Sequence, residues 1–400
     1  MKKLEKSVPV IRFKGFSEAW EQRKLGDITE SFSGGTPQAG NSDYYDGEIP
    51  FIRSGEINDE QTELFITDEG LNNSSAKIVE KGDILYALYG ATSGEVGISQ
   101  INGAINQAIL AIRPTKDDNS YLIVQWLLKQ KEAIIRTYLQ GGQGNLSSSI
   151  VKELTLMLPK DKTEQAKIGV FFKQLDDTIA LHQRKLDALK LLKKGFLQQM
   201  VTKSGENIPK IRFDDFDDIW EQRILGEFLK ESKIKGSNGS LAKKLTVKLW
   251  RKGVVPKEEI YTGSSATQYY IRKTGQFMYG KLDFLNQAFG IVPLELNGYE
   301  STLDSPAFDI EDILNETFLL EYVSLARFYK YQGNIANGSR RAKRIHTDTF
   351  FEMPIPLPNS NEQQKIGTFS QQIDDLITLQ QNKLEKLSSL KRFYLKNMFI

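Results

Sequence analysis

The sequence has no cysteine and only two histidines, and these absences exclude several classes of protein. Without cysteine the chain can form no disulfide, no thiolate metal site and no cysteine nucleophile. His182 and His346 are too few for a histidine-rich metal site. No apolar run approaches the roughly 18 residues that a membrane span needs, and residues 1–5 lack the apolar core of a signal peptide. We therefore expect a cytoplasmic protein without a membrane partner.

The common catalytic motifs are missing as well. The sequence contains no G-x-x-x-x-G-K-[ST] phosphate loop, no H-E-x-x-H zinc motif and no G-x-S-x-G nucleophile elbow. It also lacks the Asn-Pro-Pro-aromatic and Phe-x-Gly-x-Gly stretches of an adenine methyltransferase. The acidic pairs Asp176-Asp177 and Asp374-Asp375 are expected to lie away from the apolar face of their helices, as a solvated or partner-binding stripe. The chain is therefore expected not to be an enzyme.

One long pattern occurs twice, with the second copy about 200 residues after the first. A solenoid repeat has a far shorter period of roughly 20–50 residues, so the pattern predicts a duplicated domain and a duplicated helix with an approximate two-fold relation. Two-fold protein surfaces suit duplex DNA, which is the commonest two-fold ligand. The matching segments are Ile11-Arg12-Phe13 with Ile211-Arg212-Phe213, Trp20-Glu21-Gln22-Arg23 with Trp220-Glu221-Gln222-Arg223, and Glu164-Gln165 with Glu362-Gln363.

Two segments have the pattern of long helices. Asp161 and Asn359 stand at N-cap positions after Pro159 and Pro358, and a glutamate follows each three residues later, which is the spacing of a capping box. The apolar positions then alternate in steps of four and three, the heptad seam of a coiled coil. Burying both seams predicts that the two helices pair, and the similar domain beside each helix favours an antiparallel pair, with polar His182 and Gln380 fixing the register. The seam positions are Ile168, Phe172, Leu175, Ile179, His182, Leu186, Leu189, Phe196, Met200, Ile366, Ile373, Ile377, Gln380, Leu384, Leu387, Tyr394 and Met398.

The rest of each copy favours strands. Gly82-Asp83-Ile84-Leu85-Tyr86 indicates a strand after a turn, and Asn102-Gly103 and Asn297-Gly298 indicate β-hairpins. Trp20 and Trp220 are expected to be structural anchors. We therefore expect an α+β protein of two similar strand-rich domains with an internal pseudo-two-fold. Its parts are a first domain at residues 1–157, a spacer helix at 158–204, a second domain at 205–356 and a C-terminal spacer helix at 357–400.

The distribution of charge singles out one loop as a candidate DNA contact. Residues 27–157 carry 9 basic and 18 acidic side chains, whereas residues 227–350 carry 18 and 14. A cluster of four cations precedes the second helix, and arginine suits both phosphates and a guanine edge, although an ordinary basic loop is an alternative. This loop supplies the candidates Asn337, Ser339, Arg340, Arg341, Lys343 and Arg344. The matching uncharged segment, a base-reading loop or a flexible linker, supplies Gln143, Asn145, Ser147 and Ser148.

The order and duplication of these motifs resemble the specificity subunit of a type I restriction–modification enzyme over essentially all 400 residues. The resemblance rests on the two Ile-Arg-Phe…Trp-Glu-Gln-Arg-x-Leu-Gly segments, on the Gly-Asp-Ile-Leu-Tyr strand and on the Leu-Pro…Glu-Gln junctions before both helices. It implies two target-recognition domains held apart by an antiparallel helical pair. It also implies a subunit that recognises a bipartite DNA site and carries out no chemistry.

The resemblance further implies partners and cofactors. The ligand would be double-stranded DNA, and two methyltransferase subunits would dock on the helices. ATP-dependent restriction subunits would join through the methyltransferases. S-adenosylmethionine, ATP and magnesium would be bound by those partners, and no cofactor by this chain. Because Gly275-Gln276 replaces Gly82-Asp83, base-contacting positions cannot be transferred from one copy to the other.

Two other functions fit part of the pattern. The near-neutral net charge of +2 would suit a two-headed coiled-coil scaffold that binds only proteins. A restriction–methyltransferase with fused recognition domains is the enzymatic alternative, and the missing motifs make it a poor fit. Binding to a library of bipartite DNA sites distinguishes the scaffold from the specificity subunit.

Overall fold

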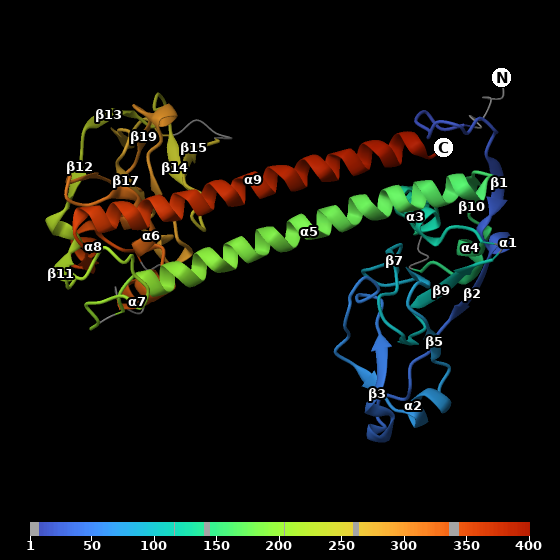
Figure 1. The fold of residues 1–400 in the computed structure, drawn as a ribbon. Coiled ribbons are helices and arrows are strands. Elements are labelled where there is room, and N and C mark those ends of the chain that lie inside the picture. The colour runs from blue at the N-terminus through green and yellow to red at the C-terminus, as the bar shows by residue number, and fades with distance from the viewer. Residues whose placement is uncertain (1–7, 116, 140–144, 204, 259–263, 336–343) are drawn as a thin grey trace. The chain divides into compact units, whose positions relative to one another are not determined.

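The computed structural model describes residues 8–115, 117–139, 145–203, 205–258, 264–335 and 344–400. The chain forms two compact units (Figure 1): unit 1 combines Met1–Gln183 with Asn382–Ile400, and unit 2 is Arg184–Gln381. Each unit contains a domain of strands and short helices together with parts of two long helices. The α+β class expected from the sequence is confirmed. Among the described residues, no helix is both long enough and apolar enough to cross a membrane.

In unit 1 an antiparallel strand pair joins the two ends of the domain. β1 (Glu21–Lys24) pairs with β10 (Thr155–Leu158), the strand that leads into the first long helix. Trp20, directly before β1, is buried in the core of the unit. A four-stranded antiparallel sheet has the order β2 (Thr29–Ser33), β9 (Ile109–Pro114), β6 (Ile84–Ala87) and β7 (Val96–Ile98). The helices around it are α1 (Leu25–Ile28), α3 (Ser120–Leu139) and α4 (Ser148–Glu153).

Unit 2 repeats this framework strand for strand. β11 (Glu221–Ile224) pairs with β21 (Pro354–Leu357), and Trp220 is buried beside them. The four-stranded sheet has the order β12 (Leu229–Ser232), β20 (Ala307–Ile310), β17 (Phe277–Tyr279) and β18 (Phe289–Ile291). The helices are η2 (Leu225–Glu227), η3 (Phe284–Asn286), α6 (Glu316–Val323), α7 (Ala326–Ile335) and α8 (Thr347–Phe351). The duplication in the sequence is therefore a duplication of one framework.

The domains differ in their second sheet. In unit 1 its order is β4 (Phe65–Ile66), β3 (Tyr45–Ile52), β8 (Gly103–Ile105) and β5 (Lys77–Val79), with β3 and β8 parallel, and η1 (Ser42–Tyr44) and α2 (Asp68–Asn72) lie beside it. In unit 2 the order is β13 (Lys235–Asn238), β16 (Gln268–Ile271) and β19 (Glu300–Ser301), and η4 (Leu294–Leu296) precedes β19. Unit 2 also has a separate hairpin of β14 (Leu245–Val247) and β15 (Val254–Pro256).

The two Asn-Gly hairpins expected from the sequence are wrong. Each dipeptide instead connects a strand of the first sheet to a strand of the second, β7 to β8 in unit 1 and β18 to β19 in unit 2. The asparagine side chain is used locally, because Asn102 Oδ1 accepts from the Lys81 amide at 2.7 Å and Asn297 Oδ1 accepts from the Thr274 amide at 3.1 Å. A strong local turn signal was thus overridden by the pairing of the strands with other partners.

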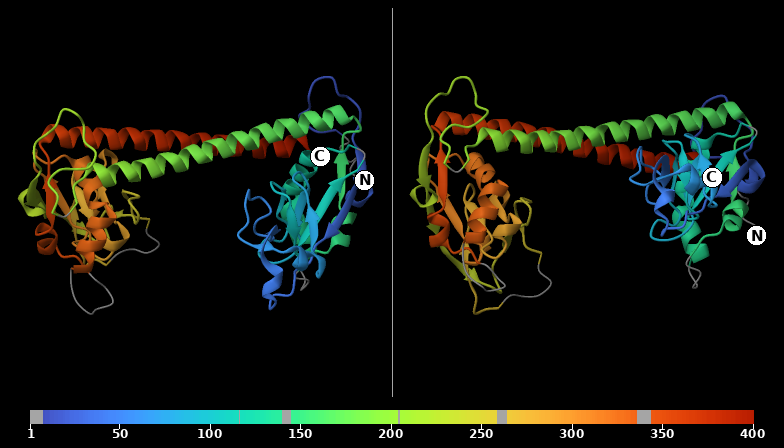
Figure 2. Two further views of the ribbon diagram at one scale, coloured as in Figure 1. Left: turned by 60° about the horizontal axis from the view of Figure 1, so that its bottom comes forward. Right: turned by 90° about the horizontal axis from the view of Figure 1, so that it is seen from below.

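Both long helices contain 39 residues: α5 is Lys162–Met200 and α9 is Ser360–Met398. In both views of Figure 2 the strands of each unit gather on one side of the helix segments that belong to it. Every seam position predicted from the sequence is buried or half-buried, whereas most positions between them are exposed. The seam is therefore covered by packing in both units.

The helix segments run antiparallel within each unit. In unit 1 the rings of Phe171 and Tyr394 have centroids 4.9 Å apart, and Lys391 bonds Asp176 at 2.6 Å, so one residue number rises as the other falls. Each contact has a counterpart in unit 2 displaced by 198 residues in both partners. These counterparts are Phe196 with Phe369, at 5.4 Å between centroids, and Lys193 with Asp374, at 2.6 Å.

Candidate nucleic-acid interface

The repeated sequence motifs hold the framework together. In unit 1 the guanidinium of Arg12 donates to both carboxylate oxygens of Glu164 at 2.6 and 2.7 Å, and in unit 2 Arg212 does the same to Glu362 at 2.8 Å. Both carboxylates are buried, and the hydrogen bonds raise the pKa of each arginine. The capping-box expectation is therefore only half right, because each glutamate pairs with an arginine some 150 residues away instead of reaching back to its own N-cap.

The glutamine that follows each glutamate binds the start of the long helix to the residue that precedes a helix of the domain, α3 in unit 1 and α6 in unit 2. Gln165 Oε1 accepts from the Asn119 amide at 3.1 Å, and Gln363 Oε1 accepts from the Asn315 amide at 2.8 Å. The same asparagines cap α3 and α6 with their side chains. A side chain at Gly169 would collide with Asn119, its Cβ lying 2.2 Å from the amide oxygen, so the glycine of the motif is a packing requirement.

The Gly-Asp and Gly-Gln segments are structural too. Asp83 holds Arg113 with two hydrogen bonds of 2.7 and 2.8 Å at the start of β6. At the same place in unit 2, Gln276 donates to Asp309 at 2.7 Å. The two copies therefore use a different pair for the same contact, and the difference says nothing about base recognition.

A buried polar layer in unit 1 corrects the expectation for the acidic pairs. Asp176 faces the domain and accepts from the hydroxyl of Tyr121 at 2.7 Å and from Gln125 at 3.1 Å, and it pairs with Lys391 of α9. Burial and the bond to Asp176 raise the pKa of Tyr121. Asp177 does project outward, where it binds Lys173 of its own helix. The first acid of the pair is thus a structural acceptor, and only the second lies on the outer face.

The corresponding layer in unit 2 is more strongly charged. Glu321 of α6 is 2 % exposed and accepts from Lys193 at 2.9 Å and from Ser370 at 2.6 Å. Arg251, from the turn between β14 and β15, donates to both oxygens of Glu321 at 2.5 and 2.8 Å. Asp374 accepts from Lys193 at 2.6 Å and completes the layer. Burial alone would raise the pKa of Glu321, but the hydrogen bonds and charges of Arg251, Lys193 and Ser370 lower it to about 2.

Most of the predicted DNA-binding residues lie outside the described part of the chain, and those are Gln143, Asn337, Ser339, Arg340, Arg341 and Lys343. Asn145 is exposed and forms a β-bridge with Tyr89. Ser147 is the N-cap of α4 and accepts from the Ile150 amide at 3.3 Å, and half-buried Ser148 begins that helix. Arg344 is exposed and donates to Asp304 at 3.0 Å. The structure therefore gives Ser147 a capping role, and base contacts by these residues stay a prediction.

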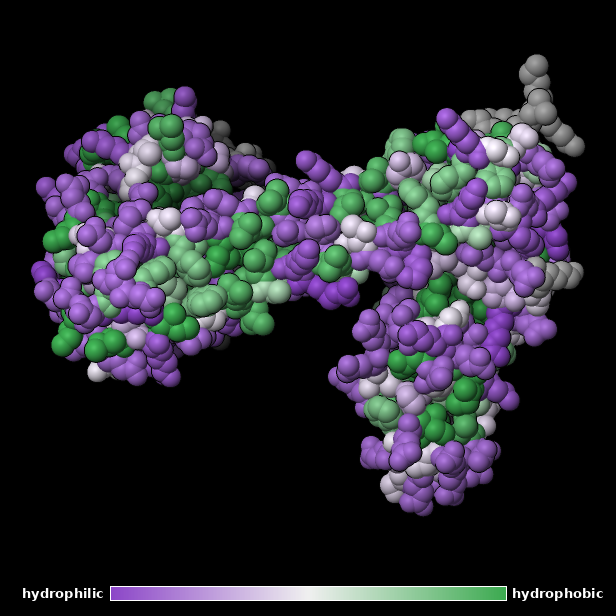
Figure 3. All heavy atoms as spheres, in the orientation of Figure 1, coloured by the Kyte–Doolittle hydropathy of each residue, from purple (hydrophilic) through white to green (hydrophobic). Residues whose placement is uncertain are grey.

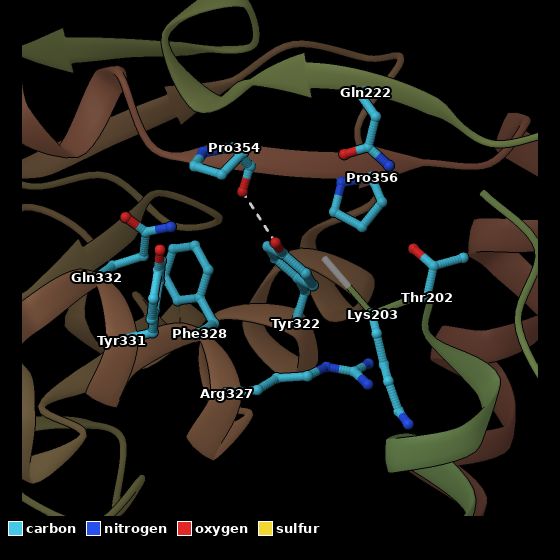
Figure 4. Close-up of a pocket in the computed structure, with 10 residues that line it drawn as sticks. All are labelled: Thr202, Lys203, Gln222, Tyr322, Arg327, Phe328, Tyr331, Gln332, Pro354 and Pro356. Carbon is cyan, nitrogen blue, oxygen red and sulfur yellow. Dashed lines mark hydrogen bonds between the residues drawn. The ribbon is translucent and has the colours of Figure 1, made fainter. Parts of the chain in front are cut away.

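A cavity of about 590 Å³ lies in unit 2 between β11, β21, α6 and α7 (Figure 4). Tyr322 donates to the carbonyl of Pro354 at 2.9 Å at one wall, and Arg327 uses its guanidinium on the carbonyls of Gln198 and Val201 at the end of α5. The described lining contains no carboxylate and no histidine. Nor do the described residues gather three or more metal-ligating side chains anywhere.

The outer faces of the long helices carry exposed apolar side chains at matched positions. Leu181 of α5 and Leu379 of α9 are 198 residues apart and 44 % and 48 % exposed. Leu192 and Leu390 have the same spacing and are 45 % and 42 % exposed. Figure 3 shows hydrophobic side chains interrupting the hydrophilic surface of the two helices. Each unit therefore has one such leucine from α5 and one from α9.

The sequence reasoning missed Arg251 and Glu321. For Glu321 the sequence does contain an indication, because it stands six residues after Asn315, as Gln125 stands six residues after Asn119. An alignment of the two helices would have shown a carboxylate where the other copy has an amide, and a buried carboxylate requires a cation. Nothing in the sequence showed that the cation would come from a turn some 70 residues earlier.

The frameworks, polar layers and divergent second sheets define a chain made of two copies of one recognition domain. The model of the type I restriction modification DNA specificity domain matches residues 17–191 and, again, residues 220–389. The chain belongs to this family.

Relatives with known assignments and solved structures agree with this result. The chain is 21 % identical over 393 residues to the type I restriction enzyme MjaVIII specificity subunit of Methanocaldococcus jannaschii, covering 94 % of this chain and 91 % of that protein. It is 28 % identical over 228 residues to the MjaIX specificity subunit of the same organism, covering 53 % and 52 %. The crystal structure of the type I restriction–modification S subunit from M. genitalium shares the fold with a TM-score of 0.65 and 14 % identity, covering 98 % of this chain and 99 % of that one.

Proposed function

We propose that this chain is the specificity subunit of a type I restriction–modification enzyme and that it binds a bipartite site in duplex DNA. Each unit binds one half of the site. The observation that carries this function is that the two units share the strand order of the framework but differ in their second sheet. Two domains in which different second sheets are attached to equivalent frameworks are suited to two different half-sites.

The chain directs chemistry that other subunits perform. Methyltransferase subunits supply S-adenosylmethionine-dependent methylation, and restriction subunits that join through them supply ATP- and magnesium-dependent cleavage. Two observations support a subunit without chemistry of its own: the phosphate-loop, zinc, nucleophile-elbow and adenine-methyltransferase motifs are missing from the sequence, and the described lining of the cavity in unit 2 has no carboxylate or histidine. The paired carboxylates on the helices are occupied by structural contacts or lie on the outer face.

Two methyltransferase subunits dock on the helices, one on each unit. The matched leucines support this arrangement, because Leu181 and Leu390 in unit 1 repeat as Leu379 and Leu192 in unit 2 with nearly equal exposure. A single exposed leucine is ordinary, but its repetition at the matched position of both units is what supports one docking surface on each. Serine at Leu192 and Leu379 is expected to reduce the number of bound methyltransferases from two to one, as read by native mass spectrometry. The matched variant at Leu181 and Leu390 should have the same effect.

The decisive experiment uses the assembled complex. Methylome sequencing of a host with and without this gene yields the modified sequence, and binding is then measured on a duplex with that sequence and on duplexes with either half scrambled. We expect specific binding that is lost when either half is scrambled. Binding without sequence preference, together with normal assembly of protein partners, would support the two-headed scaffold instead.

The basic segment before α8, most of which lies outside the described residues, is proposed to contribute to the second half-site. Alanine at Arg340, Arg341, Lys343 or Arg344 should lower the slope of log affinity against log salt by about 0.9 for each phosphate that the variant no longer binds. Removal of a hydrogen bond to a base should instead cost roughly 1–3 kcal/mol of discrimination. Unchanged affinity, slope and preference in all four variants would leave the loop as ordinary solvated surface.

A further inference from the structure

The hairpin of β14 and β15 is a strongly basic part of unit 2 that the framework does not explain. Residues 243–257 contain no aspartate or glutamate, and their six cations are Lys243, Lys244, Lys248, Arg251, Lys252 and Lys257. The inner face of the hairpin is fixed, because Leu245, Val247 and Val254 are buried in a small core of the domain. At its tip Lys248 and Lys252 are exposed.

The tip of this hairpin is a strained turn. The amide of Lys252 donates to the carbonyl of Leu249 at 3.3 Å, and the two residues between them, Trp250 and Arg251, have φ values of 58° and 56°. Two successive positive φ angles belong to a type I′ turn, for which Asn-Gly is the favoured sequence. A bulky side chain at positive φ is an outlier that the surrounding structure must enforce. Strain of this kind is concentrated at functional sites.

The contacts of the turn explain how the strain is held. Arg251 projects inward onto the buried carboxylate of Glu321, and its amide donates to the carbonyl of Gln287 at 3.0 Å. The amide of Trp250 donates to the carbonyl of Asn286 at 2.8 Å. With Arg251 fixed inward, the Trp250 side chain is left 58 % exposed between two exposed lysines. The strained turn therefore presents an indole flanked by cations.

We propose that the tip of this hairpin, residues 248–252, is a DNA contact of unit 2. Lys248 and Lys252 bind backbone phosphates, and the indole of Trp250 packs against the sugar or base edge of the same duplex. Arg251 is a positioning residue, because it acts through the turn. This inference rests on the proposed function and deepens it by assigning contact residues that lie outside the loop predicted from the sequence.

Charge favours DNA over a protein as the occupant. An exposed indole alone suits either, but the exposed Lys248 and Lys252 beside it, in a segment (residues 243–257) without aspartate or glutamate, complement a polyanion. Lysines fix the backbone of a duplex, and an indole between them is placed to pack against a sugar or a base edge. The tip also carries Leu249, which is 37 % exposed, whereas the matched leucines proposed to hold a protein partner lie on the outer faces of α5 and α9.

The test measures affinity of the assembled complex for the recognised duplex over a range of salt concentrations. Trp250→Asn is the informative variant, because asparagine tolerates positive φ and relieves the strain. We expect its affinity to fall about 5- to 100-fold, because the apolar packing of the indole against the duplex is lost, with an unchanged salt slope and a thermal midpoint no lower than that of the wild type. The double variant Lys248→Gln/Lys252→Gln should lower the salt slope by about 1.8. The controls are Tyr331→Ala, which removes another exposed aromatic of unit 2, and Lys210→Gln/Lys330→Gln, which removes two other exposed lysines.

Each alternative outcome overturns the inference. Unchanged affinity of Trp250→Asn in a complex whose wild type binds its site specifically removes the hairpin contact and leaves the proposed function intact. Weaker association with the methyltransferase, with normal DNA affinity once assembled, makes the tip a protein contact instead. A wild-type complex that binds no DNA sequence specifically contradicts the proposed function itself.

Discussion

In unit 1 and unit 2 a helix of the domain packs against the long helices at the same place, but through side chains of different charge. In unit 1 α3 offers a neutral amide, Gln125, to Asp176 of α5, and the buried Phe172 lies one turn before that aspartate. In unit 2 the corresponding residues are the carboxylate Glu321 and the small Ser370, whose hydroxyl binds that carboxylate. The added negative charge is matched by Arg251. Because unit 2 has the carboxylate of Glu321 where unit 1 has the amide of Gln125, Arg251 can join the β14–β15 hairpin to the shared framework.

The largest effect is expected from exchanging the part of one unit that differs most between the copies, which in unit 1 lies within residues 27–157. Replacing residues 27–157 with the corresponding region of another family member should change one half-site completely and leave the other unchanged, because the framework that receives the region is the same. Specific sites exceed non-specific DNA in affinity by about 10³-fold or more, so methylome sequencing will show the change clearly. A change in both halves, or in neither half of an active complex, contradicts the assignment of one half-site to each unit.

The charged layer of unit 2 should depend on its carboxylate. Glu321→Gln makes this position resemble Gln125 but leaves Arg251 and Lys193 without their buried partner. Breaking a buried ion pair from one side costs about 3–5 kcal/mol. Hydrogen exchange monitored by mass spectrometry should show faster opening of α6, with unit 1 unaffected. Glu316→Gln, at an exposed position of the same helix, is the control and should change stability by about 0.5 kcal/mol or less.

The same layer should make unit 2 more sensitive to acid. The folded-state pKa of Glu321 is about 2, below the ordinary value of 4.5. Its stabilisation is therefore complete above pH 4.5 and is lost as the pH falls from there toward 2, by an amount on the order of 3 kcal/mol. Because a protonated glutamate resembles glutamine, the stability difference between wild type and Glu321→Gln should shrink over this range. A difference that stays constant between pH 6 and pH 3 contradicts the role of the carboxylate.

The two anchoring tryptophans offer the finest comparison. Trp220 Nε1 donates to Glu362 at 3.1 Å, whereas the buried Nε1 of Trp20 has no hydrogen-bond partner. Phenylalanine at either position removes a similar apolar area, so only Trp220→Phe loses a hydrogen bond to a charged group. Its cost should exceed that of Trp20→Phe by about 1–2 kcal/mol in the opening free energy of its own unit. Equal costs would show that the bond contributes nothing net.

The two units also show what the sequence could predict. Periodicity and caps predicted two long helices, and α5 and α9 begin and end within the residue ranges expected for them. These features depend on neighbours close along the chain. The roles of Asn102-Gly103, Asp176 and Arg251 could not be predicted, because they depend on partners 21, 215 and 70 residues away. Such pairings are decided by the sheet order and the register of the helices.

The C-terminal part of α9 belongs to unit 1, and this affects the order in which the chain can fold during synthesis. The core of unit 1 includes Met398 and Phe399, and the Phe399 ring lies 6.4 Å from Trp20, which the ribosome has made 379 residues earlier. At ordinary rates of translation this interval lasts roughly 20–80 s. Unit 2 is continuous along the chain, so it can be completed first. The domain that emerges first is therefore the last to close, because its core stays incomplete until Met398 and Phe399 have been made.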